Sequence, residues 1–306
     1  MKPVALDFTY MGTKRQIAQH VAEVISLGPP GILLEAFAGM SAVGNAVAPR
    51  RPLWCNDIQR FACTVAGAFF TSQSPPKVSK HAVQMCQTLF QRNKEALGSI
   101  FGQRLEQEQH AYASGEIDAI RNLSETFVAA SESRSCIAKR SYWRRTPNHF
   151  PYCLFSVTYA GGYLGLQQAI DIDSLRFALD SLARRGDTTR ETSRWMLLAL
   201  CQAMGRISNS TGHFAQYLSV KPHTKQRFLA KRRRSVWHEW QRALDGMLPV
   251  GTKEWRLTNR VFQSESIQLI RRMARHKCQP AVVYCDPHYT ADHYSRYIRP
   301  SMPTRE

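Results

Sequence analysis

The chain has 306 residues, of which 43% are hydrophobic, so it can bury the core of one large domain or two smaller ones. Its formal net charge is +18 and its pI is near 9.9. Such an excess of Lys and Arg favours a polyanionic partner, nucleic acid before an anionic membrane surface. No apolar run approaches the roughly 20 residues that span a bilayer, and the amino terminus lacks a signal-peptide core. We therefore expect a cytoplasmic protein.

The eight cysteines form no Cys-x-x-Cys pair, which disfavours a disulfide framework or a zinc site. Cys55 and Cys285 lie in apolar, strand-like runs, so free and mostly buried thiols are expected. We expect no metal.

The first predicted element is a helix near the amino terminus. Residues 10–15 read Tyr-Met-Gly-Thr-Lys-Arg and precede a helical pattern over 17–25. Gly12 and Thr13 would form a turn and a cap, which leaves Lys14 at a helix start. Taken alone, this segment is explained by a solvated basic helix start.

Residues 31–44 predict a buried strand, a turn of small residues and a helix. Small residues let a ligand approach the backbone closely, and the next strand, 52–56, is followed by Asp57. An acidic residue about 20 positions after a glycine-rich turn is the usual partner of ribose hydroxyls in a nucleotide-binding α/β half. Glu35 and Asp57 fit that spacing. A strand-to-helix turn of this kind without a ligand is also common.

Residues 77–148 change in character to polar helices, with helical patterns over 83–97 and 117–130. The stretch 139–150 interleaves guanidinium groups with aromatic rings, which suits phosphate contact and stacking on an unpaired base. A solvated loop with a few packed rings fits equally well, and the local charge favours the first interpretation. The candidate contacts in this stretch are Arg140, Arg144 and Arg145.

A glycine-rich turn at 159–165 precedes predicted helices over 173–185 and 191–207, and a basic run covers 221–234. Such a run is usually a solvated helix face. In a chain of this net charge it becomes a candidate contact to a nucleic-acid backbone. The residues proposed for that contact are Lys231, Arg232, Arg233 and Arg234.

The α/β pattern returns near the carboxyl end, with a strand over 257–262 and a helix over 267–276. The apolar run 282–285 then leads into Asp286-Pro287-His288-Tyr289. This pattern predicts a buried parallel strand with a ligand-facing loop at its carboxyl end, where open α/β sheets place their chemistry.

The order of these segments predicts two domains. Residues 1–76 and 255–306 form one discontinuous, doubly wound α/β half, and residues 77–254 form a mainly helical, basic insertion. We therefore expect a cofactor-binding domain with a recognition domain inserted into it.

Three short motifs and the region between them resemble the Dam-like, alpha-class DNA adenine methyltransferases. The motifs are Tyr-x-Gly-Thr-Lys at 10–14, Glu-Ala-Phe-Ala-Gly-Met at 35–40 and Asp-Pro-His-Tyr at 286–289. The resemblance covers residues 8–297 and is weaker through the insertion. It implies a Rossmann-like sheet and site-specific methyl transfer from S-adenosylmethionine to the exocyclic amine of an adenine flipped out of duplex DNA.

The resemblance assigns roles to matching residues. In the cofactor site, the Lys14 ammonium would pair with the methionine carboxylate and Asp57 would bind the ribose. In the base pocket, the Asp286 carboxylate and the Pro287 carbonyl would accept both amine protons and aim the nitrogen lone pair at the methyl group. Tyr289 would stack on the flipped base. The other cofactor contacts implied are Tyr10, Glu35, Phe37, Ala38 and Gly39.

Two features depart from the family pattern. His288 stands where the family has a second proline, so we predict that His288→Pro raises methyl transfer in matched assays by fixing the loop. The matching sequence stops at Tyr297, whereas further strands and helices follow in the family. We therefore expect a carboxyl-terminally truncated or split enzyme that is inactive alone.

Other functions stay open. The main alternative is a non-catalytic DNA-binding remnant or a subunit of a split methyltransferase. An RNA or protein methyltransferase and an enzyme that methylates the cytosine amine are further alternatives. The implied partners are duplex DNA, with a complementing carboxyl-terminal fragment or a cognate restriction endonuclease.

Overall fold

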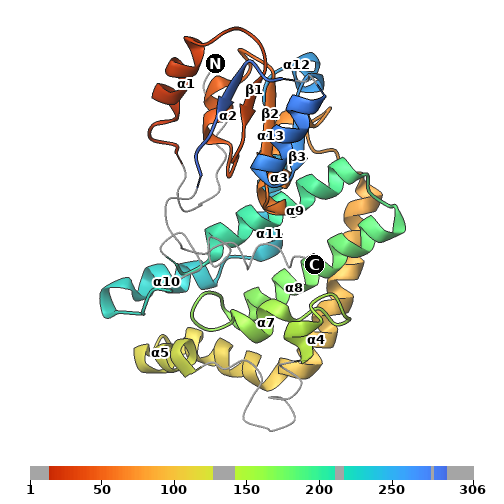
Figure 1. Ribbon diagram of the computed structural model, residues 1–306. Helices are drawn as coiled ribbons and strands as arrows, with labels where there is room; N and C mark the ends of the chain where they lie inside the picture. Colours follow the sequence, from red (N-terminus) through yellow and green to blue (C-terminus); the bar gives the residue numbers. More distant parts are fainter. Residues whose placement is uncertain (1–13, 127–141, 211–216, 277–278, 288–306) are drawn as a thin grey trace. The chain divides into compact units, whose positions relative to one another are not determined.

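The computed structural model describes residues 14–126, 142–210, 217–276 and 279–287 (Figure 1). Tyr10, Arg140, His288 and Tyr289 therefore lie outside the described residues. Within them, the chain divides into two compact units. Unit 1 contains 14–77 and 246–287, and unit 2 contains 78–245.

Unit 1 is an α/β unit with a four-stranded parallel sheet of order β3-β2-β1-β4. The α/β class and the parallel sheet expected from the sequence are confirmed. The elements are α1 (Ala18–Ser26), β1 (Leu33–Glu35), α2 (Ala42–Val47), β2 (Leu53–Asp57), α3 (Arg60–Thr71), α12 (Lys253–Leu257), β3 (Arg260–Gln263), α13 (Ser266–Arg275) and β4 (Val282–Tyr284).

The chain passes outward from β1 to β2 and β3, then returns through α13 to pair β4 with the other edge of β1 (Figure 1). Helix α13 packs on the face formed by Leu34 and Trp54, with its residues Leu269 and Met273. Side chains alternate along a strand, so Glu35 points to the opposite face, where α2 lies. The crossing of the chain from one face to the other makes the gap between β1 and β4 a topological switch point.

Two sequence-based expectations about these strands are wrong. Leu257 belongs to α12 rather than to a strand, because the Thr252 hydroxyl accepts a hydrogen bond from Trp255 N–H and starts a short helix there. Strand β4 is not buried, since its middle residue Val283 is 44% exposed. Among the described strands, β4 forms the edge of the sheet beside β1.

The boundary of unit 1 near residue 246 differs from the expected position at 255. The segment between them packs on α3, because Val250 N–H donates to the Phe69 carbonyl at 2.8 Å. The buried Arg256 guanidinium donates to the carbonyls of Ser72, Val250 and Gly251. These bonds tie residues 246–259 to the α/β unit.

Unit 2 is helical in its described part. Its elements are α4 (Lys80–Ser114), α5 (Ile117–Thr126), α7 (Leu154–Thr158), α8 (Leu166–Arg185), α9 (Arg190–Ile207), a 3-10 turn (Pro222–Thr224), α10 (Lys225–Arg232) and α11 (Val236–Gly246). Helix α4 runs along α8, and it extends well beyond the helix expected over 83–97. Polar residues fix their spacing, since Asn93 of α4 bonds to the Tyr152 backbone and to Ser174 of α8.

Helix α8 begins at Leu166, before the start expected at 173. The buried Glu108 carboxylate accepts hydrogen bonds from Leu166 N–H at 2.6 Å and Gln167 N–H at 3.1 Å. A carboxylate at a helix start satisfies unpaired amides and interacts favourably with the helix dipole. The partner comes from α4, so the local sequence could not reveal it.

The cysteine and membrane expectations can be compared with the described residues. Cys55, Cys86, Cys153 and Cys201 are buried and free, as expected, whereas Cys285 is exposed because it follows the edge strand β4. No helix in the described part of the chain has the length and apolar character required to cross a membrane.

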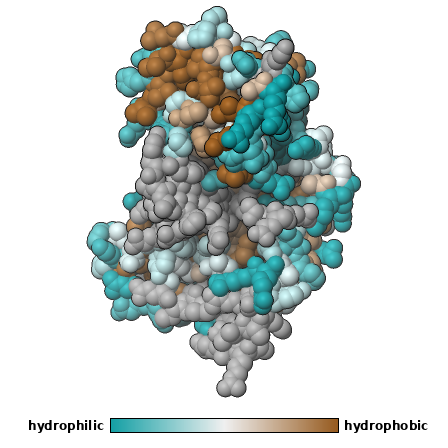
Figure 2. Space-filling model, in the orientation of Figure 1, coloured by the Kyte–Doolittle hydropathy of each residue, from teal (hydrophilic) through white to brown (hydrophobic). Residues whose placement is uncertain are grey.

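The surface of unit 1 carries exposed apolar side chains. Figure 2 shows hydrophobic residues gathered over the part of this unit that holds α1. Val24 of α1 and Leu27, which directly follows the helix, are largely exposed. Ala18, Ala22 and Ile25 form the buried face of the same helix.

Candidate functional site

The candidate site lies where the loops after β1 and β4 leave the sheet. These strands are parallel neighbours, with Glu35 opposite Tyr284 in register. Ala36 N–H donates to the Tyr284 carbonyl at 2.9 Å, so pairing continues to the point where both loops begin. The segments 37–39 and 285–287 therefore emerge at the same sheet edge and at the switch point, where open α/β sheets bind ligands.

An ion pair joins the amino-terminal segment to this edge. Lys14 Nζ lies 3.0 Å from Asp286 Oδ2, and the two side chains are 28% and 14% exposed. Lys14 stands just before α1 and Asp286 just after β4, so residues from opposite ends of the sequence meet in one place. Pro287 is exposed beside them.

The loop after β1 has an unusual backbone. Gly39 has φ of 50° and Ser41, the residue before α2, has φ of 48°. A left-handed conformation is ordinary for glycine but costly for other residues, and such strain gathers at functional sites. Ser41 is held there by its N–H, which donates to the Ala38 carbonyl at 2.6 Å.

Asp57 ties this loop to the end of β2. Its Oδ2 accepts from Gly39 N–H at 2.8 Å, and its Oδ1 accepts from Gln59 N–H at 2.8 Å. The Ala38 N–H also donates to the Asn56 carbonyl at 2.8 Å. Three of the residues predicted for the cofactor site, Ala38, Gly39 and Asp57, are therefore brought together.

Glu35 lies behind the loop, on the face that carries α2. It is buried, and it accepts hydrogen bonds from Gly44 N–H at 2.8 Å and from the Cys55 thiol at 3.6 Å. Burial raises the pKa of Glu35 to about 7, against the opposing effect of these bonds. Burial also raises the pKa of the Cys55 thiol, which keeps it protonated and able to donate. This position gives Glu35 a role in holding α2 against the sheet.

Asn56 and Ser266, which the sequence did not indicate as site residues, support the loop after β1 through hydrogen bonds to its backbone. Asn56 is fully buried, and its Nδ2 donates to the carbonyls of Ala36 and Ser264. Ser266 Oγ donates to the same Ala36 carbonyl at 2.6 Å. An asparagine at the end of an otherwise apolar strand was the available signal, because a buried amide must find hydrogen-bond partners.

The basic run of unit 2 divides into buried and exposed residues. Arg232 is 7% exposed, and its guanidinium donates to the carbonyls of Gly161, Gly162 and Tyr163. The expected contact of Arg232 with DNA is therefore wrong, because this side chain holds the glycine-rich turn. Successive residues of a helix point about 100° apart, so a basic run on a helix sends some members inward.

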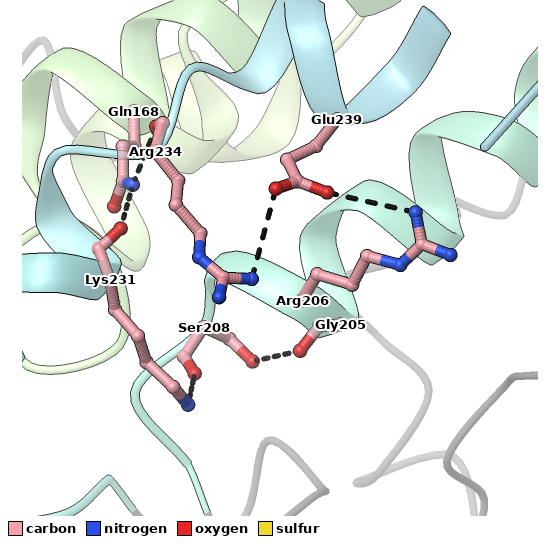
Figure 3. Close-up of polar contacts among 7 residues, drawn as sticks. All are labelled: Gln168, Gly205, Arg206, Ser208, Lys231, Arg234 and Glu239. Carbon is pink, nitrogen blue, oxygen red and sulfur yellow. Dashed lines mark hydrogen bonds and ion pairs between the residues drawn. The ribbon is translucent and has the colours of Figure 1, made fainter. Parts of the chain in front are cut away.

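Figure 3 shows two other residues of the basic run, Lys231 and Arg234. Lys231 Nζ donates to the Ser208 carbonyl at 2.7 Å. Arg234 lies 3.7 Å from the Glu239 carboxylate, which also pairs with Arg206. Contact of Lys231, Arg233 and Arg234 with DNA stays a prediction, with Arg233 exposed.

The side chains of the stretch 139–150, which was expected to combine cations and rings, also differ in exposure where the structure describes them. Trp143 lies with its ring centroid 6.4 Å from that of the buried Phe101, whereas Tyr142 is exposed. Arg144 Nε donates to Thr158 Oγ1 at 3.3 Å in an exposed position. Arg144 and Arg145 both remain candidates for phosphate contact.

Neither a metal-binding cluster among the described residues nor a similar known protein assigns a further role to this site. Among the described residues, no three His, Cys, Asp or Glu side chains gather in a way that could hold a metal ion. No family model, no curated protein and no solved structure matches the chain.

Proposed function

We propose that the chain is an S-adenosylmethionine-dependent DNA adenine methyltransferase of the Dam-like, alpha-class type, with a sheet of the methyltransferase kind in unit 1 and a recognition function in unit 2. The observation that carries the proposal is the 3.0 Å ion pair between Lys14 and Asp286 at the switch point. The sequence resemblance assigns one residue to the cofactor and the other to the reacting amine. Their meeting at one sheet edge is what a single site requires.

The residues present fit the cofactor. Gly39 adopts a positive φ in a loop of small residues, which lets a ligand approach the backbone closely. Lys14 offers an ammonium for a carboxylate, and Asp57 stands at the loop as a hydrogen-bond acceptor. When bound, S-adenosylmethionine would supply a methyl group activated by its sulfonium charge.

The chain's own groups would act by positioning and electrostatics. The Asp286 carboxylate and the Pro287 carbonyl would accept the two protons of the exocyclic amine. That arrangement draws the nitrogen lone pair out of ring conjugation and toward the methyl group. Lys14 would leave Asp286 for the cofactor carboxylate, so that Asp286 can accept from the amine. Tyr289, outside the described residues, would stack on the flipped base.

Calorimetric titration with S-adenosylmethionine tests the cofactor assignment. We expect binding by the unsubstituted chain and a loss of about tenfold or more with Lys14→Met, since a hydrogen-bonded charge pair contributes about 1.5–3 kcal/mol. Lys80→Met, at an exposed lysine of α4, is the matched control and should bind normally. No binding by the unsubstituted chain would overturn the proposal.

Methyl transfer to unmethylated duplex DNA tests the base pocket. We expect the exocyclic amine of adenine to be the acceptor of the methyl group. Asp286→Asn should lower transfer strongly while cofactor binding persists, because the amide keeps an acceptor oxygen for the amine but loses the negative charge. Transfer at an unchanged rate by Asp286→Asn would contradict the assigned role.

One observation favours the alternative of a non-catalytic DNA-binding remnant or subunit. Both oxygens of Asp57 already accept backbone N–H groups, which is also what a purely structural carboxylate does. A protein of that kind need not bind S-adenosylmethionine, so the titration separates the two functions. Competition by RNA against duplex DNA separates the further alternative of an RNA methyltransferase.

A further inference from the structure

Unit 2 contains a cavity that the proposed methyl transfer does not use, and of its lining residues only Phe150 belongs to the stretch 139–150 that the sequence singles out. Its volume is about 290 Å³, at the small end of ligand pockets, which run from about 300 to 1,000 Å³. It is lined by Leu89 and Arg92 of α4, by Phe150, and by Phe177, Ser181, Arg184 and Arg185 of α8.

Helix geometry explains why these side chains converge. Leu89 and Arg92 are one turn apart on α4, while Phe177, Ser181 and Arg184 are spaced by four and three residues on α8. Residues at such spacings share a helix face. Because α4 and α8 pack along each other, the two faces meet with Phe150 between them.

The cavity offers positive charge without an acidic counterpart. Among the described residues that line it, three are arginines and none is acidic. Within the described part of the chain no carboxylate pairs with Arg92, Arg184 or Arg185, and Arg184 donates to the Ser181 hydroxyl at 3.3 Å. The carboxylate of Asp180, nearby on α8, is engaged by Arg176 and Tyr152.

The same cavity offers aromatic surface. Phe150 is 39% exposed, and its ring centroid lies 5.2 Å from that of the buried Phe177. The Arg92 guanidinium lies 4.9 Å from the centre of the Phe150 ring. Arginines in the last turn of α8 are favoured by the helix dipole alone. That effect does not explain a third arginine from another helix or a half-exposed ring between them.

We propose that this cavity binds one unpaired nucleotide of a nucleic-acid strand, with its phosphate on Arg92, Arg184 and Arg185 and its base against Phe150. Guanidinium groups bind phosphate through paired hydrogen bonds, and aromatic rings stack on any base. A base within a duplex has both faces covered, so the nucleotide must be unpaired. The net charge of +18 favours a nucleic-acid strand as its source. The site lies wholly within unit 2 and goes beyond the proposed methyl transfer.

The test is fluorescence anisotropy with a labelled single-stranded oligothymidylate, in the absence of S-adenosylmethionine, at several salt concentrations. The Arg184→Gln/Arg185→Gln double variant should bind about tenfold more weakly or worse. The slope of log affinity against log salt should become shallower by about 0.7 for each phosphate that the variant no longer neutralises. Arg104→Gln, on the same helix as Arg92 but outside the cavity, should change affinity little. Circular dichroism melts would establish that each variant is folded.

The base contact is tested with Phe150→Leu and an abasic strand of the same length. Phe150→Leu should weaken oligothymidylate binding about fivefold or more and leave binding of the abasic strand unchanged. Equal affinities of the double variant and Arg104→Gln would overturn the site. Equal weakening of both strands by Phe150→Leu, or a duplex that depends on these arginines as strongly as the single strand, would overturn the assignment of an unpaired base. Because no cofactor is present, failure here and failure of the proposed methyltransferase function are distinguishable.

Discussion

Whether a charged side chain is buried or exposed determines its role more than its residue type does. Glu35 and Asp57 both follow the spacing of a nucleotide site, yet one carboxylate lies against α2 and the other at the loop. Arg232 and Arg233 are neighbours in sequence, but one is buried and the other exposed. Each contrast can be tested by substitution.

The protonation of Glu35 should make stability depend on pH. The folded chain keeps the Glu35 proton up to about pH 7, whereas the unfolded chain releases it near the ordinary value of 4.5. This contribution to stability is therefore fully present below about pH 4.5 and is lost as pH rises through 7, by roughly 3 kcal/mol. Glu35→Gln, which keeps an acceptor for Gly44 N–H, should flatten that fall.

Urea unfolding from pH 4.5 to 8 measures this difference. Other buried acids, such as Asp173, titrate in both proteins, so the difference between the two curves isolates Glu35. Parallel curves for the unsubstituted chain and Glu35→Gln would show that Glu35 does not carry a proton in this range.

Arg232 should contribute to stability rather than to binding. Arg232→Met removes the donor to three backbone carbonyls and should lower the free energy of unfolding by about 3 kcal/mol, since buried acceptors without partners are costly. Arg233→Gln, at the exposed neighbour, should change stability by less than about 0.5 kcal/mol. Chemical unfolding of the two variants measures both values. A similar, small effect of the two substitutions would contradict the structural role of Arg232.

Among the helices and strands, the position of α2 against the sheet decides the form of the candidate site. A Cβ added to Gly44 would lie 2.5 Å from Glu35 Oε2 and 2.8 Å from Leu53 Cδ2. The helix can approach this closely because residue 44 has no side chain. Its N–H therefore reaches the Glu35 carboxylate, and the strained loop before α2 is fixed in place.

Gly44→Ala tests this packing. Overpacking of this kind costs about 1–3 kcal/mol, so we expect unfolding at lower urea and weaker binding of S-adenosylmethionine. Gly98→Ala is the matched control, because a Cβ there meets nothing within 4 Å. Gly98 lies inside α4, and its substitution should stabilise the chain by about 0.5–1 kcal/mol through helix propensity. Equal effects of the two substitutions would show that α2 does not need close approach.

The sequence predicted most elements because their patterns are local. Apolar runs located β1 and β2, and helical periodicity located α9 and α13 within a residue or two at each end. It failed where a distant partner decides the outcome, as at the start of α8, where Glu108 of α4 provides the cap. The candidate site shows the same limit. Motifs located Asp57 and Asp286, but the support from Asn56 and Ser266 depends on the fold.

For the molecule as a whole, the fold does not account for the net charge of +18. Some of this charge is used internally, since Arg232 and Arg256 are buried against carbonyls. Other arginines are exposed, including Arg144, Arg145 and Arg233. Only the exposed cations can displace counterions from a nucleic-acid backbone.

Binding of duplex DNA by the unsubstituted chain should therefore fall steeply with salt. A protein with six or more phosphate contacts becomes about a thousandfold or more weaker in affinity between about 50 and 200 mM salt, with a log–log slope of about −0.9 per contact. We expect a slope of this kind, and we expect Arg233→Gln or Arg144→Gln to reduce it by about one contact while folding is unchanged. Filter binding across this salt range gives each slope. Affinity that does not change with salt would mean that the exposed charge serves another partner, because phosphate contact without counterion release is physically excluded.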